Sequence, residues 1–180
     1  MIVVLMGVSG SGKTTVGRTL ARKLGWEFVD ADDLHPEANI AKMAAGVALT
    51  DADRWPWLDR VAAEARMRSA HGQHVVIACS ALKRAYRDRL VSGAGGDSGV
   101  CFVYLKGDAA IIEPRLADRR GHYMPASLLA SQFAALEEPE DAIVIDIRQS
   151  PESQAASIAA QLRSCGGSVA ASAASAGVPP

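Results

Sequence analysis

Residues 7–14, Gly-Val-Ser-Gly-Ser-Gly-Lys-Thr, match the pattern G-x-x-x-x-G-K-[ST] of a loop that binds phosphate groups. The apolar run MIVVLM at residues 1–6 precedes this loop and is typical of a buried parallel strand. The stretch TVGRTLARKL at residues 15–24 follows it, with apolar side chains at helical spacing. A chance match is improbable at the usual glycine share of about 7%, and a strand and a helix flank this one. The stretch therefore predicts binding of a nucleoside triphosphate.

Each residue type in the loop has a physical reason. Glycines let successive backbone N–H groups turn inward around an anion, and the start of the following helix favours negative charge. Lys13 is expected to reach the β- and γ-phosphates, and Thr14 to bind Mg²⁺, with Asp30 as a further candidate ligand. ATP and Mg²⁺ are thus the predicted cofactors. The predicted nucleotide-binding residues are Gly7, Ser9, Gly10, Ser11, Gly12, Lys13, Thr14, Thr15, Arg115 and Arg119.

Short apolar runs recur along the chain and alternate with segments of helical composition. This alternation indicates an α/β protein with a parallel sheet covered by helices on both faces. Pro114 implies that its helix begins later or bends, since an interior proline removes a backbone hydrogen bond. The later predicted strands are residues 26–30, 74–79, 100–105 and 142–147, the later predicted helices are 37–45, 51–69, 84–90, 108–119, 126–136 and 151–164, and a surface loop is predicted at 92–99.

Length and composition indicate one ordinary globular domain. We expect it to span residues 1–164, with a disordered tail at 165–180 that is rich in Ala, Ser and Gly. A net charge of −1 gives no reason to expect a nucleic-acid partner, and no apolar run is long enough to span a membrane. Three cysteines without C-x-x-C spacing, and a first strand that leaves no room for a signal peptide, predict a cytoplasmic protein.

Ligands of parallel sheets bind beyond the carboxyl ends of the strands, and polar residues follow the predicted strands here. Asp30 and Asp32 follow the second strand and, in extended chain, would point the same way, with Asp33 opposite. A carboxylate that faces the γ-phosphate could accept the proton of a substrate hydroxyl, which favours Asp32 as a general base. The alternative is that these aspartates form turns and caps, which is the favoured interpretation for Asp33.

Two further patterns bear on the reaction class. Three arginines, Arg115, Arg119 and Arg120, precede Gly121, where a mobile lid could hinge; any single one could instead belong to a solvated helix face. The third strand has no aspartate at its end, and no N-K-x-D motif is present, which favours a small-molecule kinase over a switch or motor. Trp55 and Trp57 are expected to be packing residues.

Beyond the phosphate loop, ordered blocks of sequence resemble the phosphate-loop gluconokinases, which are relatives of shikimate and adenylate kinases. Together the LHP, CSALK and GHYM segments are far more specific than the loop alone. The blocks are MGVSGSGKTT (6–15), DADDLHP (30–36), NIAKMAAG (39–46), DADRWPWL (51–58), CSALKRAYRD (79–88), VYLKGD (103–108), RRGHYMP (119–125) and SQFAALEEP (131–139).

This resemblance implies transfer of the ATP γ-phosphate to the 6-hydroxyl of D-gluconate, giving 6-phospho-D-gluconate. It also implies a five-stranded phosphate-loop fold of the nucleoside monophosphate kinase type, a mobile lid at about residues 115–127, and a homodimer. By analogy with shikimate kinases, Asp32 would bind the acceptor hydroxyl and Arg54 the carboxylate. The expected catalytic residues are Asp32, Lys13 and Arg119, and the expected substrate-binding residues are Asp32, His35, Arg54, Ser80, Lys83, Arg87 and Gln132.

Three alternatives stay open at this point. A kinase of the same build could act on another sugar acid, polyol or shikimate-like acceptor, because substrate identity depends on loops. An ATP-binding regulatory protein without turnover would fit the missing acidic residue after the third strand. A polynucleotide kinase is disfavoured by the absence of a basic excess.

Overall fold

The computed structural model describes residues 1–96, 99–117 and 129–173, with side chains up to residue 163. The described helices and strands are β1 (Ile2–Met6), α1 (Lys13–Leu24), β2 (Glu27–Asp30), the 3₁₀ helix η1 (Ala31–Leu34), α2 (Glu37–Ala44), α3 (Asp51–Ala70), β3 (Val75–Ala78), α4 (Arg84–Ala94), β4 (Val100–Lys106), α5 (Ala109–Ala117), α6 (Leu129–Ala135), β5 (Ile143–Asp146) and α7 (Pro151–Ala173). The strands form one five-stranded sheet in the order β2-β3-β1-β4-β5, and every pairing is parallel. The predicted α/β fold class is confirmed.

Strand β1 is central because it is apolar on both of its faces. All five of its residues are buried, and it pairs with β3 on one side and β4 on the other. Alternate side chains point to opposite faces of a strand, so Val3 and Leu5 belong to one core cluster, whereas Ile2, Val4 and Met6 belong to the other. A strand buried on both faces can be continuously apolar, as the sequence of β1 is.

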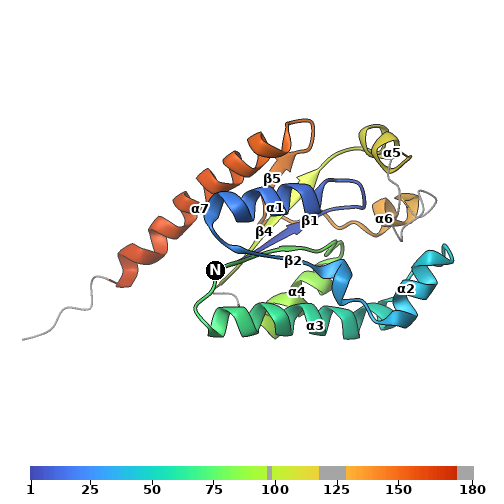
Figure 1. The fold of residues 1–180 in the computed structure, drawn as a ribbon, viewed down its shortest axis with the longest axis horizontal. Helices are drawn as coiled ribbons and strands as arrows, with labels where there is room; N and C mark the ends of the chain where they lie inside the picture. Colours follow the sequence, from blue (N-terminus) through green and yellow to red (C-terminus); the bar gives the residue numbers. More distant parts are fainter. Residues whose placement is uncertain (97–98, 118–128, 174–180) are drawn as a thin grey trace, which may run out of the picture.

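Helices cover both faces of this sheet, as Figure 1 shows. Helices α1 and α7 supply Leu20 and Ile158 to the core on one face. Helices α3 and α4 supply Leu58 and Leu90 to the core on the other. Most of α2 stands clear of the sheet, beside η1 at the end where the strands β1 and β3 terminate (Figure 1). The helices on the two faces of the sheet therefore hold the carboxyl ends of the strands together at one edge of the molecule.

Local signals in the sequence set several helix ends. Thr50 and Asp53 form a capping box at the start of α3, in which each side chain accepts a hydrogen bond from the other's backbone N–H. Asp108 Oδ1 accepts from Ile111 N at 3.1 Å before α5, as expected for a capping residue. Pro114 lies inside α5, which runs on to Ala117.

Two predicted boundaries are wrong. Helix α4 continues to Ala94, into the segment predicted as a loop at 92–99, because its end packs against α3: a Cβ added at Gly93 would lie 2.7 Å from Ala62 Cβ. Helix α7 continues to Ala173 rather than ending near Ser164, and its last turns extend beyond the sheet (Figure 1). In this extension Ala170, Ala171 and Ala173 favour helix, whereas Gly166 and Gly167 disfavour it.

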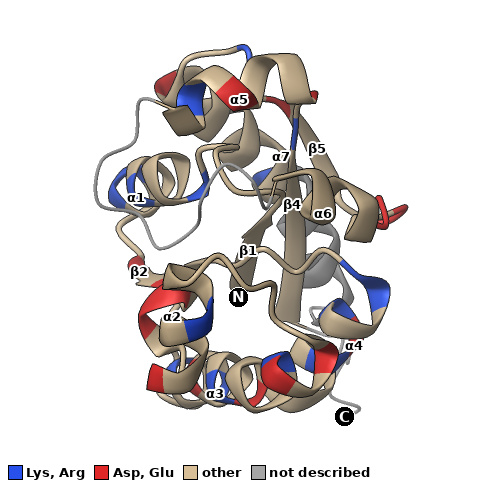
Figure 2. Ribbon diagram, turned by 90° about the vertical axis from the view of Figure 1, so that its right-hand side faces the viewer, with Lys and Arg blue, Asp and Glu red and all other residues tan. Residues whose placement is uncertain are grey.

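Charged residues of both signs occur along α2, α3 and α4, as Figure 2 shows.

Within the described part of the chain, no helix is long and apolar enough to cross a membrane. The same residues include no group of three or more His, Cys, Asp or Glu side chains that could hold a metal ion.

Candidate active site

The phosphate loop lies between β1 and α1 and is shaped by its glycines. Gly7 and Gly10 have φ angles of 137° and 82°, which residues with a Cβ rarely adopt. A Cβ at Gly7 would lie 2.9 Å from the Leu105 carbonyl oxygen, and one at Gly10 would lie 2.9 Å from Ile112 Cγ2. Both glycines are needed for conformation and for space, so the loop closes tightly against β4 and α5.

Lys13 folds back over this loop. Its Nζ donates to the carbonyl oxygens of Gly7 and Val8, each at 3.0 Å. The ammonium group therefore lies over the beginning of the loop. The residues after it continue into α1, and the free backbone N–H groups at the start of this helix favour an anion. This arrangement places a fixed positive charge beside the predicted phosphate position.

Asp30 connects the phosphate loop to the end of β2. Its Oδ2 accepts a hydrogen bond from Thr14 Oγ1 at 2.8 Å, and its Oδ1 accepts from Asp32 N at 3.2 Å. The residues after Asp30 form the 3₁₀ helix η1 rather than extended chain, so the predicted alternation of Asp30, Asp32 and Asp33 is wrong. The Asp30 carboxylate caps that helix, and this short-range hydrogen bond is what overrides the extended geometry.

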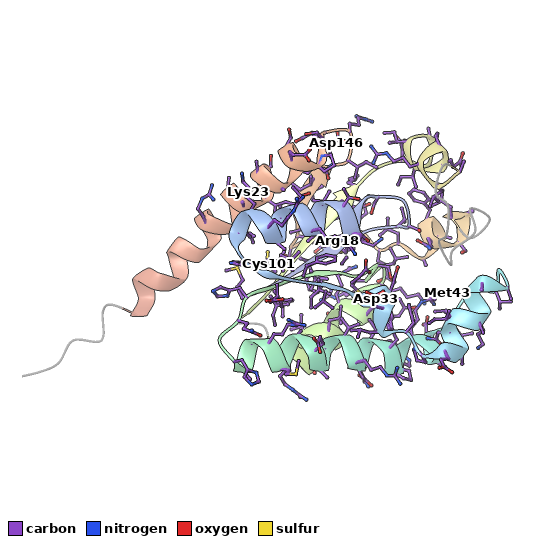
Figure 3. All side chains as sticks on the ribbon, in the orientation of Figure 1. Arg18, Lys23, Asp33, Met43, Cys101 and Asp146 are labelled. Atoms are coloured by element: carbon purple, nitrogen blue, oxygen red, sulfur yellow. The ribbon has the colours of Figure 1, made fainter. Side chains whose placement is uncertain are left out.

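A pocket opens beside the loop, on the α2 and α3 side. In Figure 3, Asp33 and Met43 mark η1 and α2 at this end of the molecule. Asp33 is exposed, whereas Asp32 faces the pocket. The pocket is lined by Ser9, Lys13, Asp32, His35, Met43, Ala48, Leu49, Arg54, Trp57, Ser80, Leu82, Tyr86, Ser131, Gln132 and Ala135. It thus joins the phosphate loop to η1, α3, α4, α6 and the segment after β3.

Trp57 and His35 form one wall of this pocket. Their rings stack at a centroid distance of 4.2 Å, and Trp57 Nε1 donates to the Ala31 carbonyl oxygen at 2.7 Å. Burial, and next the positive charge of Arg54, lower the pKa of His35 to about 4. His35 is therefore neutral near pH 7, and its ring can exchange hydrogen bonds with hydroxyl groups without adding charge.

A charged cluster surrounds Arg54 at the pocket. Arg54 NH1 donates to the Leu49 carbonyl oxygen and lies 3.5 Å from Tyr86 Oη and 3.9 Å from Asp51 Oδ1. Both carboxylate oxygens of Asp51 accept from Lys83 Nζ at 2.9 Å. Hydrogen bonds from Tyr86 and then Lys83 keep the pKa of Asp51 below its usual range. With one acid and two bases, this cluster carries an excess of positive charge, which favours an anionic ligand.

The segment after β3 brings Ser80 into the pocket through a strained turn. Ala81 is fully buried and has a φ of 43°, a conformation that is uncommon for a residue other than glycine. Ser80 O accepts from Gly7 N at 3.2 Å, which ties this turn to the phosphate loop. Arg87 stabilises this turn, because its NH1 group donates hydrogen bonds to the backbone carbonyl oxygens of Ala81, Leu82 and Glu137.

A second cavity lies on the other side of the phosphate loop, away from η1. Gly10, Ser11, Gly12, Thr15, Val16, Arg115, Gln149, Pro151 and Gln154 line it. Arg115 NH2 donates to the Ile147 carbonyl oxygen at 2.9 Å, so its guanidinium is held at this cavity from the start of the β5–α7 connection. The cavity adjoins the start of α1, beside the predicted phosphate position.

The structure therefore sorts the predicted site residues into groups. Ser9, Lys13, Asp32, His35, Arg54, Ser80 and Gln132 line the first pocket, and Gly10, Ser11, Gly12, Thr15 and Arg115 line the second. Lys83 is paired with Asp51 next to the first pocket. Arg87 is buried under the turn after β3, so the expectation that it contacts substrate is not supported by its position. Arg119, with most of the predicted lid, lies outside the described residues.

The sequence did not indicate several residues that line this pocket or lie next to it. The prediction that Trp57 is a packing residue is confirmed by its burial, but Trp57 also forms part of the pocket wall. Tyr86 and Asp51 were not singled out, although they surround Arg54. An Asp at the first position of α3 and an Arg three residues later lie on one helix face, and this spacing was the one signal that could have linked Asp51 to Arg54.

A phosphate loop at the end of a central parallel strand, with a pocket beside it that Lys13, Asp32 and Arg54 line, is the arrangement of a phosphate-loop kinase of small molecules. A family model described as "AAA domain" matches residues 2–139. A probable gluconokinase of Xenopus tropicalis is 49% identical over 162 residues, covering 82% of this chain and 85% of the relative. The thermoresistant gluconokinase of Escherichia coli K12 is 45% identical over 160 residues, covering 87% and 90%.

A solved structure shows the same likeness in three dimensions. The crystal structure of a gluconokinase from Sinorhizobium meliloti 1021 superimposes with a TM-score of 0.76 at 42% identity, covering 89% of this chain and 91% of that chain. The chain belongs to the gluconokinase family.

Proposed function

We propose that this protein transfers the γ-phosphoryl group of ATP to the 6-hydroxyl of D-gluconate, giving 6-phospho-D-gluconate and ADP. The observation that carries the proposal is the pocket in which Lys13 of the phosphate loop, Asp32 and Arg54 face one space. Gluconate needs three things of such a pocket: a partner for its carboxylate, hydrogen bonds for its hydroxyls, and a base at the attacking oxygen.

Arg54 supplies the partner for the carboxylate. Its guanidinium is part of a cluster with excess positive charge, and a planar guanidinium can pair with both carboxylate oxygens. Neutral His35 and Ser80 face the same pocket and can bind hydroxyl groups along the chain of the sugar acid. A carboxylate bound at Arg54 leaves the other end of the acceptor directed toward the phosphate loop.

Asp32 serves as the general base at that other end. Its backbone N–H is held by Asp30, and the Trp57 indole holds the Ala31 carbonyl, so η1 presents its side chain in a defined place. Asp32 accepts the proton of the 6-hydroxyl as the oxygen attacks phosphorus. Lys13 and the backbone N–H groups of the loop stabilise the charge that develops on the transferred phosphoryl group.

The donor set at the end of β2 fits a Mg²⁺ ion that accompanies ATP. Thr14 and Asp30 present a hydroxyl and a carboxylate side by side, which are the hard oxygen ligands that Mg²⁺ prefers. Mg²⁺ takes few protein ligands and completes its shell with phosphates and water. When bound, the ion would neutralise charge on the phosphates.

Five broader features belong to the same proposal. The kinase domain comprises residues 1–164, and a lid at about residues 115–127 contributes Arg119 to catalysis. The protein works as a homodimer, as the resemblance stated above implies, and it resides in the cytoplasm, as the number and spacing of its cysteines indicate. Arg115, held at the second cavity, contacts the nucleotide. Size-exclusion chromatography with light scattering tests the dimer.

A coupled assay of ATP consumption tests the reaction itself. The purified protein is given ATP and Mg²⁺ with gluconate, with other sugar acids, with shikimate, with a nucleoside monophosphate, or with no acceptor. The proposal predicts turnover that depends on gluconate, and a product whose phosphorus couples to the C6 protons in NMR spectra. Robust turnover on shikimate or a nucleoside monophosphate, with none on gluconate, would overturn the proposal.

A further inference from the structure

We infer that Gln132 of α6 contacts the phosphoryl group during its transfer, rather than only the acceptor, and this inference rests on the proposed function. Gln132 Oε1 accepts a hydrogen bond from the backbone N–H of Ser9, in the phosphate loop, at 2.7 Å. Both residues are 8% exposed, so this contact is shielded from water. It joins residues 123 positions apart in the sequence.

The contact fixes which way the carboxamide faces. A backbone N–H can only donate, so the group that meets Ser9 N must be the oxygen of the side chain. The NH₂ end of the same planar group is then directed away from Ser9 N. The orientation of the Gln132 amide is thereby set by the loop itself.

The neighbours of Gln132 place it where the two substrates would meet. Ser9 and Lys13 line the pocket from the donor side, and Asp32 lines it from the acceptor side. Gln132 lies on the wall shared by these groups, because it touches the loop and lines the same pocket. A donor in this position can reach an oxygen of the phosphoryl group as it moves from the loop toward the acceptor.

Such a donor would act mainly in the transition state. Charge in phosphoryl transfer spreads over the equatorial oxygens, and fixed donors aimed at those oxygens lower the barrier without reorganising. An acceptor-binding residue would instead change the affinity for gluconate. A residue that merely ties α6 to the loop would need only its oxygen. These three roles predict different responses to substitution.

Two variants separate these roles, with Gln161→Glu at an exposed site on α7 as the matched control. Gln132→Glu keeps the oxygen that accepts from Ser9 but loses the donor above the pKa of the new carboxyl group. Gln132→Leu loses both. We measure kcat and KM from pH 5.5 to 8, relative to the unmodified protein at each pH, together with the Kd of gluconate without ATP. The other ionisable groups of the pocket, Lys13, Asp32, His35, Arg54 and Tyr86, are present in every variant. Because Gln132→Leu adds no charge, its pH profile shows how these groups titrate when Gln132 is lost, and the Gln132→Glu profile is compared with it.

The inference predicts that both variants lose about 10²-fold in kcat at pH 8, as when one donor is removed from an oxyanion site. The Kd of gluconate stays within about 2-fold, because the contact forms during transfer. As the pH falls, the kcat of Gln132→Glu relative to that of the unmodified protein should rise by about 10-fold, because a protonated carboxyl group can donate a hydrogen bond again. The relative kcat of Gln132→Leu should stay low at every pH.

Other outcomes overturn the inference. A Gln132→Glu protein that is fully active at every pH would show that only the tie to Ser9 matters. A fully active Gln132→Leu protein would show that the charge of the Glu variant caused the loss. If Gln132→Leu fails to fold, as judged by its melting curve, the pH profile of the Glu variant decides alone. Absence of gluconate-dependent turnover by the unmodified protein would overturn the proposed function itself.

Discussion

The phosphate loop and the acceptor pocket adjoin each other but are built in opposite ways. The loop is one continuous stretch, residues 7–14, and its binding groups are mainly backbone N–H groups whose directions depend on glycine conformation. The pocket is lined by side chains that lie between Ser9 and Ala135 in the sequence and come from the loop, η1, α2, α3, α4 and α6. A short motif therefore describes the donor site, whereas the acceptor site exists only once the sheet has formed.

This difference predicts different weaknesses. Adding a Cβ to a glycine of the loop should weaken nucleotide binding. Removing a polar group from a side chain of the pocket should lower kcat or the affinity for gluconate. The residues that orient the pocket are also distinct from those that touch the ligand, because η1 depends on Asp30 and Trp57 to present Asp32. Substitutions on the acceptor side should therefore change kcat or gluconate affinity and leave nucleotide binding intact.

The largest effect is expected for Asp32→Asn. The amide has nearly the same shape but cannot accept the proton, so kcat should fall by about 10²-fold or more, as expected for loss of a general base. ATP affinity, measured by calorimetry with a non-hydrolysable analogue, should stay within a few-fold. Asp33→Asn is the matched control, since Asp33 is exposed on the same 3₁₀ helix. An Asp32→Asn enzyme with a rate within a few-fold of the original would contradict the assignment of the base.

A smaller effect is expected for Trp57→Phe. Phenylalanine can stack on His35 but has no indole N–H, so the buried Ala31 carbonyl loses its 2.7 Å hydrogen bond. Because η1 is then less well anchored, kcat should fall by about 10-fold, in proportion to roughly 1.4 kcal/mol of lost transition-state stabilisation. Trp55→Phe is the control, because Trp55 lies on the same helix and packs edge-on against Tyr86. Equal kinetic losses in the two variants would argue against this positioning role.

The last effect concerns the pH dependence of stability and leaves the rate of the reaction aside. Burial lowers the pKa of His35 to about 4, below the value of about 6.5 for the unfolded chain. The unfolded chain therefore takes up the proton first, so the free energy of unfolding should fall as the pH drops from about 6.5 to about 4. The part of this loss due to His35 amounts to at most about 3 kcal/mol.

Urea denaturation at several pH values measures this difference. In His35→Gln the free energy of unfolding should depend less on pH between 6.5 and 4, whereas His71→Gln, at an exposed site, should behave like the original protein. Parallel pH curves for the original protein and His35→Gln would show that His35 does not contribute.

The sequence was sufficient to predict the fold class and the order of the strands along the chain. Continuous apolar runs mark strands buried on both faces, and β1 with its loop is visible from residues 1–14 alone. The errors came where tertiary contacts or short-range hydrogen bonds override local propensity. Gly93 continues α4 because it packs against Ala62, and Asp30 turns the next residues into η1 because it caps them.

The acceptor side was predicted only in part. Asp32, His35, Arg54, Ser80 and Gln132 do lie around one pocket, as the motif blocks suggested. Arg87 does not line this pocket, because its guanidinium is buried and donates hydrogen bonds to backbone carbonyl oxygens. A sequence pattern does not distinguish an arginine with this structural role from one that binds a ligand. Tyr86 and Asp51 lie 35 residues apart, so their hydrogen bond and its influence on Arg54 follow from the packing of α3 against α4.

The most direct test is a crossed pair of calorimetric titrations with Gly10→Ala and Arg54→Met. Each variant is titrated with gluconate and, separately, with a non-hydrolysable ATP analogue. We predict that Gly10→Ala lowers the affinity for the ATP analogue by at least about 10-fold, because a Cβ at this position would lie 2.9 Å from Ile112 Cγ2. The affinity for gluconate should be unchanged. Arg54→Met should do the reverse, since it removes the partner of the carboxylate. Equal weakening of both ligands by both variants would contradict two separately built sites.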